Sequence, residues 1–421
     1  MSKTHYRVID AIMGAGKTTY IINELKKADP EKARYIVITP YLPEVKRFIG
    51  EVLELSFVEP VKKGNSGKLV HLHTLLEQGC NIVSTHELFK RWSMETLALL
   101  EQQDYQLIID ETVDCVRQYG VDEDDIAERS LQTLLSHNLM QIDGDGRLRW
   151  AATGEVEEFK QLKHDCDSGR LFKSPSEDGS LTYWEVPIAL LKAFSSVTIL
   201  TYMFDGSLMS AYLESVDIEP ERLTLNDGHG LVKWTLEREM EAAKSVASLI
   251  NVLDDEKLND IGERHSLSSS SLVVMESGDL EVLKNNIRGA LQNRFKAKGK
   301  DAMWSCVGKF KDGLTPHGYK GSFVACNIKA TNELRHKTAL VYIRNIYHLP
   351  PITNYFHRAK DIKLDVDRYA LSELLQWVFR SAVRDGKPVN LYLPSARMRR
   401  LLTDWACVSE ALVDKACKEV Y

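Results

Sequence analysis

A glycine-rich loop between a strand and a helix is the feature that most constrains this chain. Residues 10–19 read Asp-Ala-Ile-Met-Gly-Ala-Gly-Lys-Thr-Thr, after an apolar run at 6–9 and before a helical pattern at 19–27. Strand, glycine turn, Lys-Thr and helix together are typical of a phosphate-binding loop. The glycines let backbone N–H groups turn toward a polyphosphate, and the helix N-terminus adds partial positive charge. The segment therefore predicts a nucleotide site.

Individual side chains in the loop suit this chemistry. Lys17 is expected to reach the terminal phosphates, and the Thr18 hydroxyl to bind Mg²⁺. Ala11 stands where such loops usually carry their first glycine, and a small residue still fits there. An ordinary glycine turn before a helix is the alternative, which the Lys-Thr pair and both flanking elements disfavour. The predicted nucleotide-binding residues are Gly14, Ala15, Gly16, Lys17, Thr18 and Thr19.

A second motif supplies acidic residues. Residues 106–114, Gln-Leu-Ile-Ile-Asp-Glu-Thr-Val-Asp, form an apolar strand that ends in carboxylates. Asp110 is predicted to hold Mg²⁺, and Glu111 to position and activate the attacking water. Acidic residues at a strand end are often merely solvated. The phosphate loop upstream favours the catalytic interpretation.

Composition narrows the class of protein. A chain of 421 residues, with 44% apolar and 27% charged residues, predicts a globular protein of two or three domains. It has no apolar run of 18 residues and no apolar signal core at the start, so we expect no membrane association and a cytoplasmic location. None of the seven cysteines forms a C-x-x-C pair, which predicts reduced thiols and no zinc site.

Strand and helix patterns predict an α/β fold. Strand-like runs at 6–10, 33–39, 81–84 and 106–110 alternate with helical patterns, which indicates a parallel sheet covered by helices. A ligand would bind at the carboxyl ends of its strands. Residues 116–190 break this rhythm, with hairpin-like turns near 143–146 and 175–179. A strand at 196–201 resumes it.

The predicted domains follow from this layout. A first lobe comprises 1–115 and 191–224, residues 116–190 form an inserted subdomain, and 225–421 form a second α/β lobe. Strands of the second lobe are expected at 272–275, 322–325, 339–343 and 389–393. Its helices are expected at 279–294, 369–384 and 395–405, after a long connector helix at 236–253.

Polar residues at successive strand ends suggest contacts to nucleic acid. Thr39 and Pro40 close the second strand, and Ser84, Thr85 and His86 close the third. Hydroxyl and backbone N–H groups at one sheet edge can contact the phosphates of a single strand without reading sequence. Helix capping is the alternative for each threonine or serine taken singly.

A basic helix in the second lobe is the third element of the site. Helical spacing places Gln376, Arg380 and Arg384 on one face, with apolar residues opposite. An arginine pair there would stabilise charge on a transferring γ-phosphate. A solvated basic face is the alternative. The net charge of −6 does not indicate a nucleic-acid binder, but the run at 380–400 is locally basic and can bind phosphates.

Two further polar segments are candidates for nucleic-acid contact. Residues 327–335 follow a predicted strand, and Asn327 and Thr331 are predicted to contact a nucleic-acid backbone. The alternative is a helix start capped by Thr331. Trp304 and Tyr319 flank a stretch rich in glycine and lysine, where aromatic rings can stack bases. Packing of both rings in the core is the alternative.

With these elements in order, the chain resembles a superfamily 2 helicase of the DEAD-box-like kind, similar to compact helicases encoded by bacteriophages. Residues 14–18 match helicase motif I, and 110–114 look like motif II in its D-E-x-x-D form. Residues 39–40 and 84–86 correspond to motifs Ia and Ib, 201–207 to motif III, 331–335 to motif V and 376–384 to motif VI. Motif III reads Thr-Tyr-Met-Phe-Asp in place of Ser/Thr-Ala-Thr.

The resemblance implies two RecA-like lobes with a nucleotide cleft between them. It implies ATP and Mg²⁺ as cofactors, with ATP hydrolysis driving movement on single-stranded nucleic acid, and DNA is favoured over RNA. Arg380 and Arg384 would approach the nucleotide from the second lobe. A phage-encoded chain would act in the host cytoplasm.

Two other functions stay open. A nucleotide-gated binding module would close on a nucleic acid or a protein without unwinding, which the altered motif III favours. A P-loop kinase or simple NTPase would need no nucleic acid. The D-E-T-V-D segment and the arginine helix argue against that last function.

Overall fold

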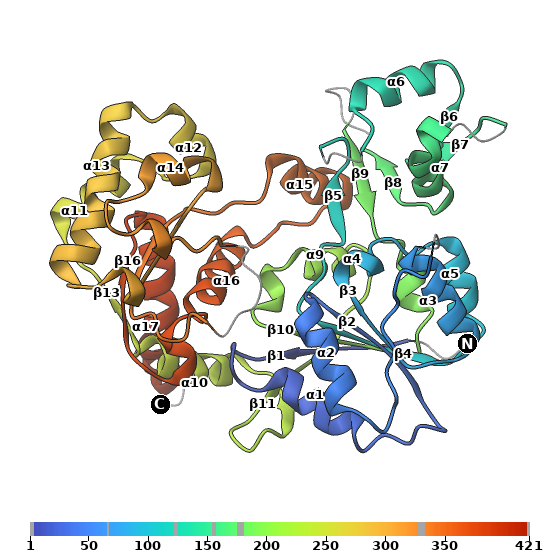
Figure 1. Ribbon diagram of the computed structural model, residues 1–421, viewed down its shortest axis with the longest axis horizontal. Coiled ribbons are helices and arrows are strands. Elements are labelled where there is room, and N and C mark those ends of the chain that lie inside the picture. Colours follow the sequence, from blue (N-terminus) through green and yellow to red (C-terminus); the bar gives the residue numbers. More distant parts are fainter. Residues whose placement is uncertain are drawn as a thin grey trace. The chain divides into compact units, whose positions relative to one another are not determined.

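The glycine-rich loop follows the first strand of a seven-stranded sheet (Figure 1). The structure is a computed structural model that describes residues 4–64, 67–121, 125–153, 157–174, 181–326 and 333–418. The chain divides into two units. Unit 1 contains residues 1–10, 16–231 and 348–364, and unit 2 contains 11–15, 232–347 and 365–421. We describe each unit by itself.

The sheet of unit 1 has the order β12-β11-β1-β10-β4-β2-β3. Its strands are β1 (His5–Asp10), β2 (Arg34–Thr39), β3 (Ile82–Thr85), β4 (Tyr105–Asp110), β10 (Ser196–Thr201), β11 (Glu221–Leu225) and β12 (Leu231–Lys233). The strands from β11 to β3 pair in parallel along this order. Asp10 pairs with Thr201, and Leu200 pairs with Asp110, so β1, β10 and β4 end level. The carboxyl ends of three neighbouring strands therefore meet at one edge.

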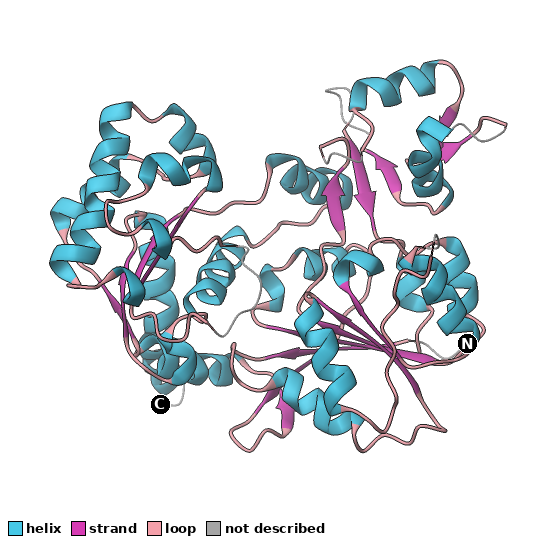
Figure 2. Ribbon diagram, in the orientation of Figure 1, coloured by secondary structure: helices cyan, strands magenta, loops and turns pink. Residues whose placement is uncertain are grey.

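Helices cover this sheet because its central strands are apolar on both faces (Figure 2). Side chains of α1 and α2, such as Ile22 and Phe48, form one cluster with Val37 and Ile108 of the sheet. The α-helices in the part of unit 1 before residue 232, outside the insertion, are α1 (Lys17–Leu25), α2 (Leu42–Glu51), α3 (Lys68–Glu77), α4 (His86–Phe89), α5 (Met94–Leu100), α8 (Ile188–Lys192) and α9 (Leu208–Glu214).

The predicted insertion contains antiparallel strands. A three-stranded sheet has the order β5-β9-β8, and β6 pairs with β7 as a hairpin around the turn predicted at 143–146. The other predicted turn, at 175–179, lies outside the described residues, between β8 and β9. The elements are β5 (Val116–Gln118), α6 (Glu128–Ser136), β6 (Met140–Ile142), β7 (Leu148–Trp150), α7 (Lys160–Asp167), β8 (Leu171–Lys173) and β9 (Thr182–Glu185).

A segment from the C-terminal half of the chain packs on this small sheet. Residues 348–364, which we call the strap, contain α15 (Pro350–Asn354) and a π-helix (Tyr355–Ala359) and belong to unit 1. Tyr355 is fully buried and its hydroxyl donates to the Glu185 carboxylate, while the Tyr183 hydroxyl donates to the Pro351 carbonyl at 3.1 Å. Arg147 pairs with the same Glu185 at 2.6 Å. The sequence had placed the strap within a second lobe running from 225 to 421.

Unit 2 contains a four-stranded parallel sheet of order β13-β16-β15-β14. Its strands are β13 (Ile250–Val252), β14 (Ala302–Cys306), β15 (Ala339–Ile343) and β16 (Val389–Tyr392). Its helices are α10 (Leu236–Ala247), α11 (Glu256–Arg264), α12 (Ser269–Val274), α13 (Ser277–Arg288), α14 (Lys311–Leu314), α16 (Val366–Val378) and α17 (Ala396–Lys418), with a π-helix at Gly289–Arg294. The α/β class with parallel sheets is therefore confirmed.

Several predicted elements of the second half were wrong. Residues 272–275 are not a strand but mostly the end of α12, because the Ser268 hydroxyl caps this helix by accepting from the Ser271 N–H. Residues 322–325 form no strand: Ser322 ends a short 3₁₀ helix (Lys320–Ser322), and Phe323 makes only an isolated bridge to Trp304. The helix predicted at 236–253 ends at Ala247, and β13 follows it. Trp304 lies in β14 and is fully buried, and Tyr319 is buried too, so neither ring is available to stack bases.

No helix in the described part of the chain is long and apolar enough to cross a membrane.

Close packing of α11 generates a prediction for unit 2. A Cβ on Gly262 would lie 1.7 Å from the Pro394 carbonyl oxygen, so Gly262→Ala forces the backbone apart. We expect this change to cost about 2 kcal/mol or more of unfolding free energy, since overpacking a rigid contact is destabilising. The measurement is urea denaturation followed by circular dichroism.

Gly278→Ala is the matched control. Gly278 lies in the first turn of α13, and a Cβ there meets no atom within 4 Å. Alanine should leave stability equal or slightly higher, because it restricts the unfolded chain. Equal destabilisation by both changes would contradict the close contact at Gly262.

Candidate nucleotide site

The loop after β1 adopts the backbone geometry that its glycines allow. Gly14 and Gly16 have φ values of 82° and 89°, in the left-handed region that glycine enters without steric cost. The Ala15 N–H donates to the Ile12 carbonyl at 3.2 Å, and Gly16 is the N-cap of α1. Lys17 is consequently the first residue of the helix. Its side chain is only 7% exposed, which is rare for lysine.

Carboxylates surround the buried Lys17. Burial lowers the pKa of its ammonium, and the nearby charges of Glu111, Asp10 and Asp110 act in the opposite direction. All three come from the ends of β1 and β4, which the parallel sheet brings to one edge. The structure thus places the predicted phosphate-binding lysine beside the predicted acidic motif.

Thr18 and Asp110, the two predicted Mg²⁺ ligands, are in contact. The Thr18 hydroxyl lies 3.2 and 3.3 Å from the two carboxylate oxygens of Asp110. Burial, followed by the charges of Glu111 and Glu44, raises the pKa of Asp110 to about 7. A buried carboxylate beside a hydroxyl fits a hard divalent cation, which would offset the charge that burial penalises.

Protein ligands for such an ion are few. Among the residues that the structure describes, no group of three or more His, Cys, Asp or Glu side chains could hold a metal. This agrees with Mg²⁺, which usually takes one or two protein ligands together with phosphates and water.

Glu111 and His86 complete the edge next to Asp110. Glu111 has a φ of 63°, unusual for a residue with a side chain, and its N–H donates to the Leu200 carbonyl at 2.9 Å. His86 Nε2 lies 2.9 Å from the Asp110 carbonyl, and burial lowers the pKa of His86 to about 4. His86 is therefore neutral and donates Nε2–H to that carbonyl. Its side chain supports the acidic motif in addition to any contact with nucleic acid.

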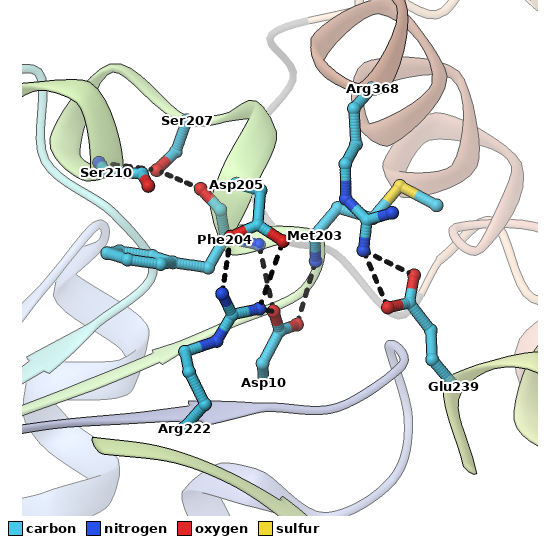
Figure 3. Close-up of polar contacts among 9 residues, drawn as sticks. All are labelled: Asp10, Met203, Phe204, Asp205, Ser207, Ser210, Arg222, Glu239 and Arg368. Carbon is cyan, nitrogen blue, oxygen red and sulfur yellow. Dashed lines mark hydrogen bonds and ion pairs between the residues drawn. The ribbon is translucent and has the colours of Figure 1, made fainter. Parts of the chain in front are cut away.

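Asp10, the last residue of β1, has a carboxylate with several polar partners (Figure 3). It accepts the N–H groups of Met203 and Phe204 at 2.9 and 3.0 Å, and it pairs with Arg222 at 2.5 Å. The side chain of Asp10 is 1% exposed. Arg222 also pairs with Asp205. The start of the phosphate loop is thereby fixed to β11 and to the turn after β10.

Sequence reasoning gave Asp10 and Arg222 no role. Asp10 was treated only as the start of the loop segment, and Arg222 lies in a stretch assigned to lobe 1 without a function. The sequence did contain a signal for Asp10, which is an acidic residue directly after Val8 and Ile9 and directly before the loop. Its partner, 212 residues away, could not be identified from spacing.

The predicted nucleic-acid residues differ in exposure. Thr39 and Ser84 are buried, and the Thr39 hydroxyl lies 3.2 Å from the Tyr41 carbonyl and 3.4 Å from that of Ser84. Both residues therefore pack inside the edge of the sheet, where the Thr39 hydroxyl bonds to backbone carbonyls. Pro40 and Thr85 are partly exposed. Asn327 and Thr331 lie outside the described residues.

The predicted arginine helix ends early. Helix α16 stops at Val378, so Gln376, Arg380 and Arg384 do not share one helical face, and Arg384 lies in a separate 3₁₀ helix (Ala382–Asp385). The Ser381 hydroxyl causes the break by donating to the Val378 carbonyl at 2.6 Å and capping the next helix. Gln376 Nε2 lies 3.5 Å from the Ser372 hydroxyl.

Arg368, which does lie in α16, makes a strong contact within unit 2. Arg368 pairs with both oxygens of Glu239 on α10, at 2.7 and 2.6 Å (Figure 3). Glu239 is 9% exposed. The geometry is that of a bidentate ion pair, which fixes α16 against α10.

Comparison with known proteins identifies relatives along almost the whole chain. Residues 244–406 match the family described as YonV C-terminal Rossmann-like domain. The chain is 36% identical over 415 residues to the SPbeta prophage-derived uncharacterized protein YonV of Bacillus subtilis strain 168, covering 95% of this chain and 98% of that protein.

Solved structures are similar only at a low level. Xpd4 of S. tokodaii matches with a TM-score of 0.41 at 12% identity, over 96% of this chain and 94% of that one. Dbp5 of S. cerevisiae, bound to RNA and ADP BeF3, matches with 0.36 at 11% identity, over 99% and 89%. The DUF1998 helicase MrfA, bound to DNA, matches with 0.33 at 10% identity, over 96% and 46%. At these scores the likeness carries no functional argument.

The Asp10 network generates a prediction. Arg222→Ala leaves a buried carboxylate without its ion-pair partner, which should cost about 2 kcal/mol or more of unfolding free energy. Urea denaturation measures the loss. Arg149→Ala is the control, because its ion pair with Asp143 is largely exposed and should contribute less than about 1 kcal/mol. Similar losses for the two variants would show that Asp10 does not depend on Arg222.

Proposed function

The chain belongs to the YonV family, and we propose that it is a Mg²⁺-dependent ATP hydrolase that acts on single-stranded nucleic acid. The supporting observation is the contact between Thr18 and Asp110, beside a buried Lys17 that faces Glu111. A lysine and a hydroxyl from a glycine loop, next to two carboxylates from a neighbouring strand end, form the minimal equipment for phosphoryl transfer to water.

The residues of the loop and of the strand end after β4 would have separate roles. Lys17 would bind the terminal phosphates, and the backbone of 14–19 would surround the phosphate chain. Thr18 and Asp110 would hold Mg²⁺, which when bound neutralises charge on the phosphates. Glu111 would accept a proton from the attacking water.

Unit 2 would supply the remaining cations. We propose that Arg380, Arg384 or both contact the γ-phosphate when nucleotide is bound, with Gln376 nearby. Arginine suits this task because it is always charged and donates several hydrogen bonds. Closure on nucleotide and release after hydrolysis would make the two units a motor on a single strand, with DNA preferred to RNA. Pro40 and Thr85 would contact the nucleic-acid backbone.

A second candidate function is an ATP-gated binding module that does not unwind. One observation favours it. The turn that stands in the place of motif III is tied to Asp10 and Arg222 through the N–H groups of Met203 and Phe204 and through the Asp205 carboxylate. It differs from the Ser/Thr-Ala-Thr segment in sequence, and its backbone and carboxylate are held at the end of β1 and by β11. Strand displacement separates the two functions, because only the motor releases a paired strand.

The main test compares ATP turnover with and without nucleic acid. Addition of single-stranded DNA should raise the ATPase rate of the wild-type chain, with a smaller increase for RNA. Lys17→Ala should abolish nucleotide binding and turnover, since it removes the cation at the phosphates. Glu111→Gln should keep ATP binding and lose turnover by about a hundredfold or more, because only the proton acceptor is neutralised.

Lys26→Ala is the control for the lysine substitution. Lys26 is exposed at the C-terminal end of α1, so its loss should change neither binding nor turnover. Unchanged turnover in Lys17→Ala would exclude the loop as the nucleotide site. A rate that no nucleic acid alters would exclude the motor.

The raised pKa of Asp110 predicts how Mg²⁺ binding depends on pH. Below about pH 7 this carboxyl is protonated, and a proton there competes with the metal, so affinity rises as the pH increases through 7. Mg²⁺ titrations of the nucleotide-free protein should show binding about tenfold weaker at pH 6 than at pH 8. Asp110→Asn should bind Mg²⁺ poorly at both values. A pH-independent affinity in the wild type would remove Asp110 from the site.

A further inference from the structure

A pocket adjoins the end of the phosphate loop, and most of its lining residues have no part in the chemistry proposed above. It measures about 510 Å³ and is lined by residues of α1 and of the turn between β11 and β12. Gly16, Tyr20, Asn23 and Glu24 line it from the helix side, and Gly228 and His229 from the turn. All these residues belong to unit 1.

The helix contributes one continuous face to this pocket. Positions 16, 20, 23, 24 and 27 recur at the spacing of neighbours on a helical surface. They begin at the last glycine of the loop and extend away from it for roughly 16 Å, at about 1.5 Å per residue. A triphosphate whose terminal group lies at Lys17 and Asp110 has its other end free to enter this space. We propose that the pocket holds the base and ribose of the bound nucleotide.

The turn presents His229 to the loop through a defined backbone. Asn226 organises it: its N–H donates to the Gly230 carbonyl at 3.0 Å, and its side-chain oxygen accepts the Gly230 N–H at 2.8 Å. The His229 N–H donates to the Asn226 carbonyl at 2.9 Å, and His229 has a φ of 57°. A Cβ built on Gly16 would lie 3.4 Å from His229 Nδ1, so the imidazole lies against the end of the loop.

The pocket offers the contacts that a nucleoside uses. The rings of Tyr20 and His229 provide flat surfaces, and bases stack on such rings whatever their sequence. Asn23 has both a donor and an acceptor, and Glu24, which pairs with Lys27 at 2.8 Å, can accept from hydroxyl or amine groups. A free polyphosphate would use none of these. The inference rests on the proposed function, because it assigns the other end of the same ligand.

The experiment compares a nucleotide with its phosphate chain alone. Binding of ATP and of inorganic tripolyphosphate, each with Mg²⁺, is measured by calorimetry for the wild type and for His229→Asn. Asparagine tolerates the left-handed backbone at this position and lacks the ring. We expect ATP binding to weaken about tenfold, the effect of losing one stacking surface, and tripolyphosphate binding to stay unchanged.

Two further variants keep the outcome specific. Asp227→Ala alters the same turn at a residue that does not line the pocket, and it should change neither affinity. Lys17→Ala should weaken both ligands, because both carry phosphates.

The results that overturn the inference differ from those that overturn the proposed function. If His229→Asn weakens ATP and tripolyphosphate equally, the ring supports the loop and holds no nucleoside. If it weakens neither, the pocket is not used. If the wild-type chain binds neither ligand, the nucleotide site itself is wrong, and the inference fails with it.

Discussion

The buried carboxylate of Asp10 is the constraint on which the arrangement of the site depends. A charge removed from water must be compensated by hydrogen bonds and an ion pair, and here two backbone N–H groups and Arg222 do so. Because these partners come from the turn after β10 and from β11, the position where β1 becomes the glycine loop is set by three strands at once. The loop begins from a fixed point, and the glycines beyond it supply the turn.

The same sheet edge concentrates charge around one lysine. Lys17 is buried beside Asp10, Asp110 and Glu111, so the cost of burying its ammonium is offset by carboxylates that also cost free energy to bury. Burial, with the charges of Glu111 and Glu44, raises the pKa of Asp110, so additional positive charge beside it would stabilise its ionised form. An edge with a surplus of buried negative charge suits a ligand that arrives with a divalent cation.

Local signals in the sequence were sufficient to predict part of the fold and of the candidate site, but not the features that depend on distant residues. Features that depend on neighbouring residues were predicted. They are the glycine loop, the apolar strand that ends at Asp110, and the alternation of strands and helices in the first half of the chain. The end of α16 depends on how the Ser381 hydroxyl is used, and the strand at Trp304 on burial in a sheet whose partners lie far along the chain. The ion pair of Asp10 with Arg222 joins positions 212 residues apart, so no spacing indicates it.

Because the strap belongs to unit 1, parts of unit 1 are synthesised both before and after residues 232–347 of unit 2. The small sheet that includes Glu185 leaves the ribosome long before Tyr355. In the folded chain the Tyr355 hydroxyl donates a hydrogen bond to the Glu185 carboxylate. Between them the chain makes most of unit 2, since residues 232–347 belong to that unit. A nascent chain that folds in order from its N-terminus therefore holds Glu185 with only part of its final set of partners. Neither unit corresponds to one uninterrupted stretch of coding sequence, and a fragment that stops before residue 348 would lack a buried tyrosine of unit 1.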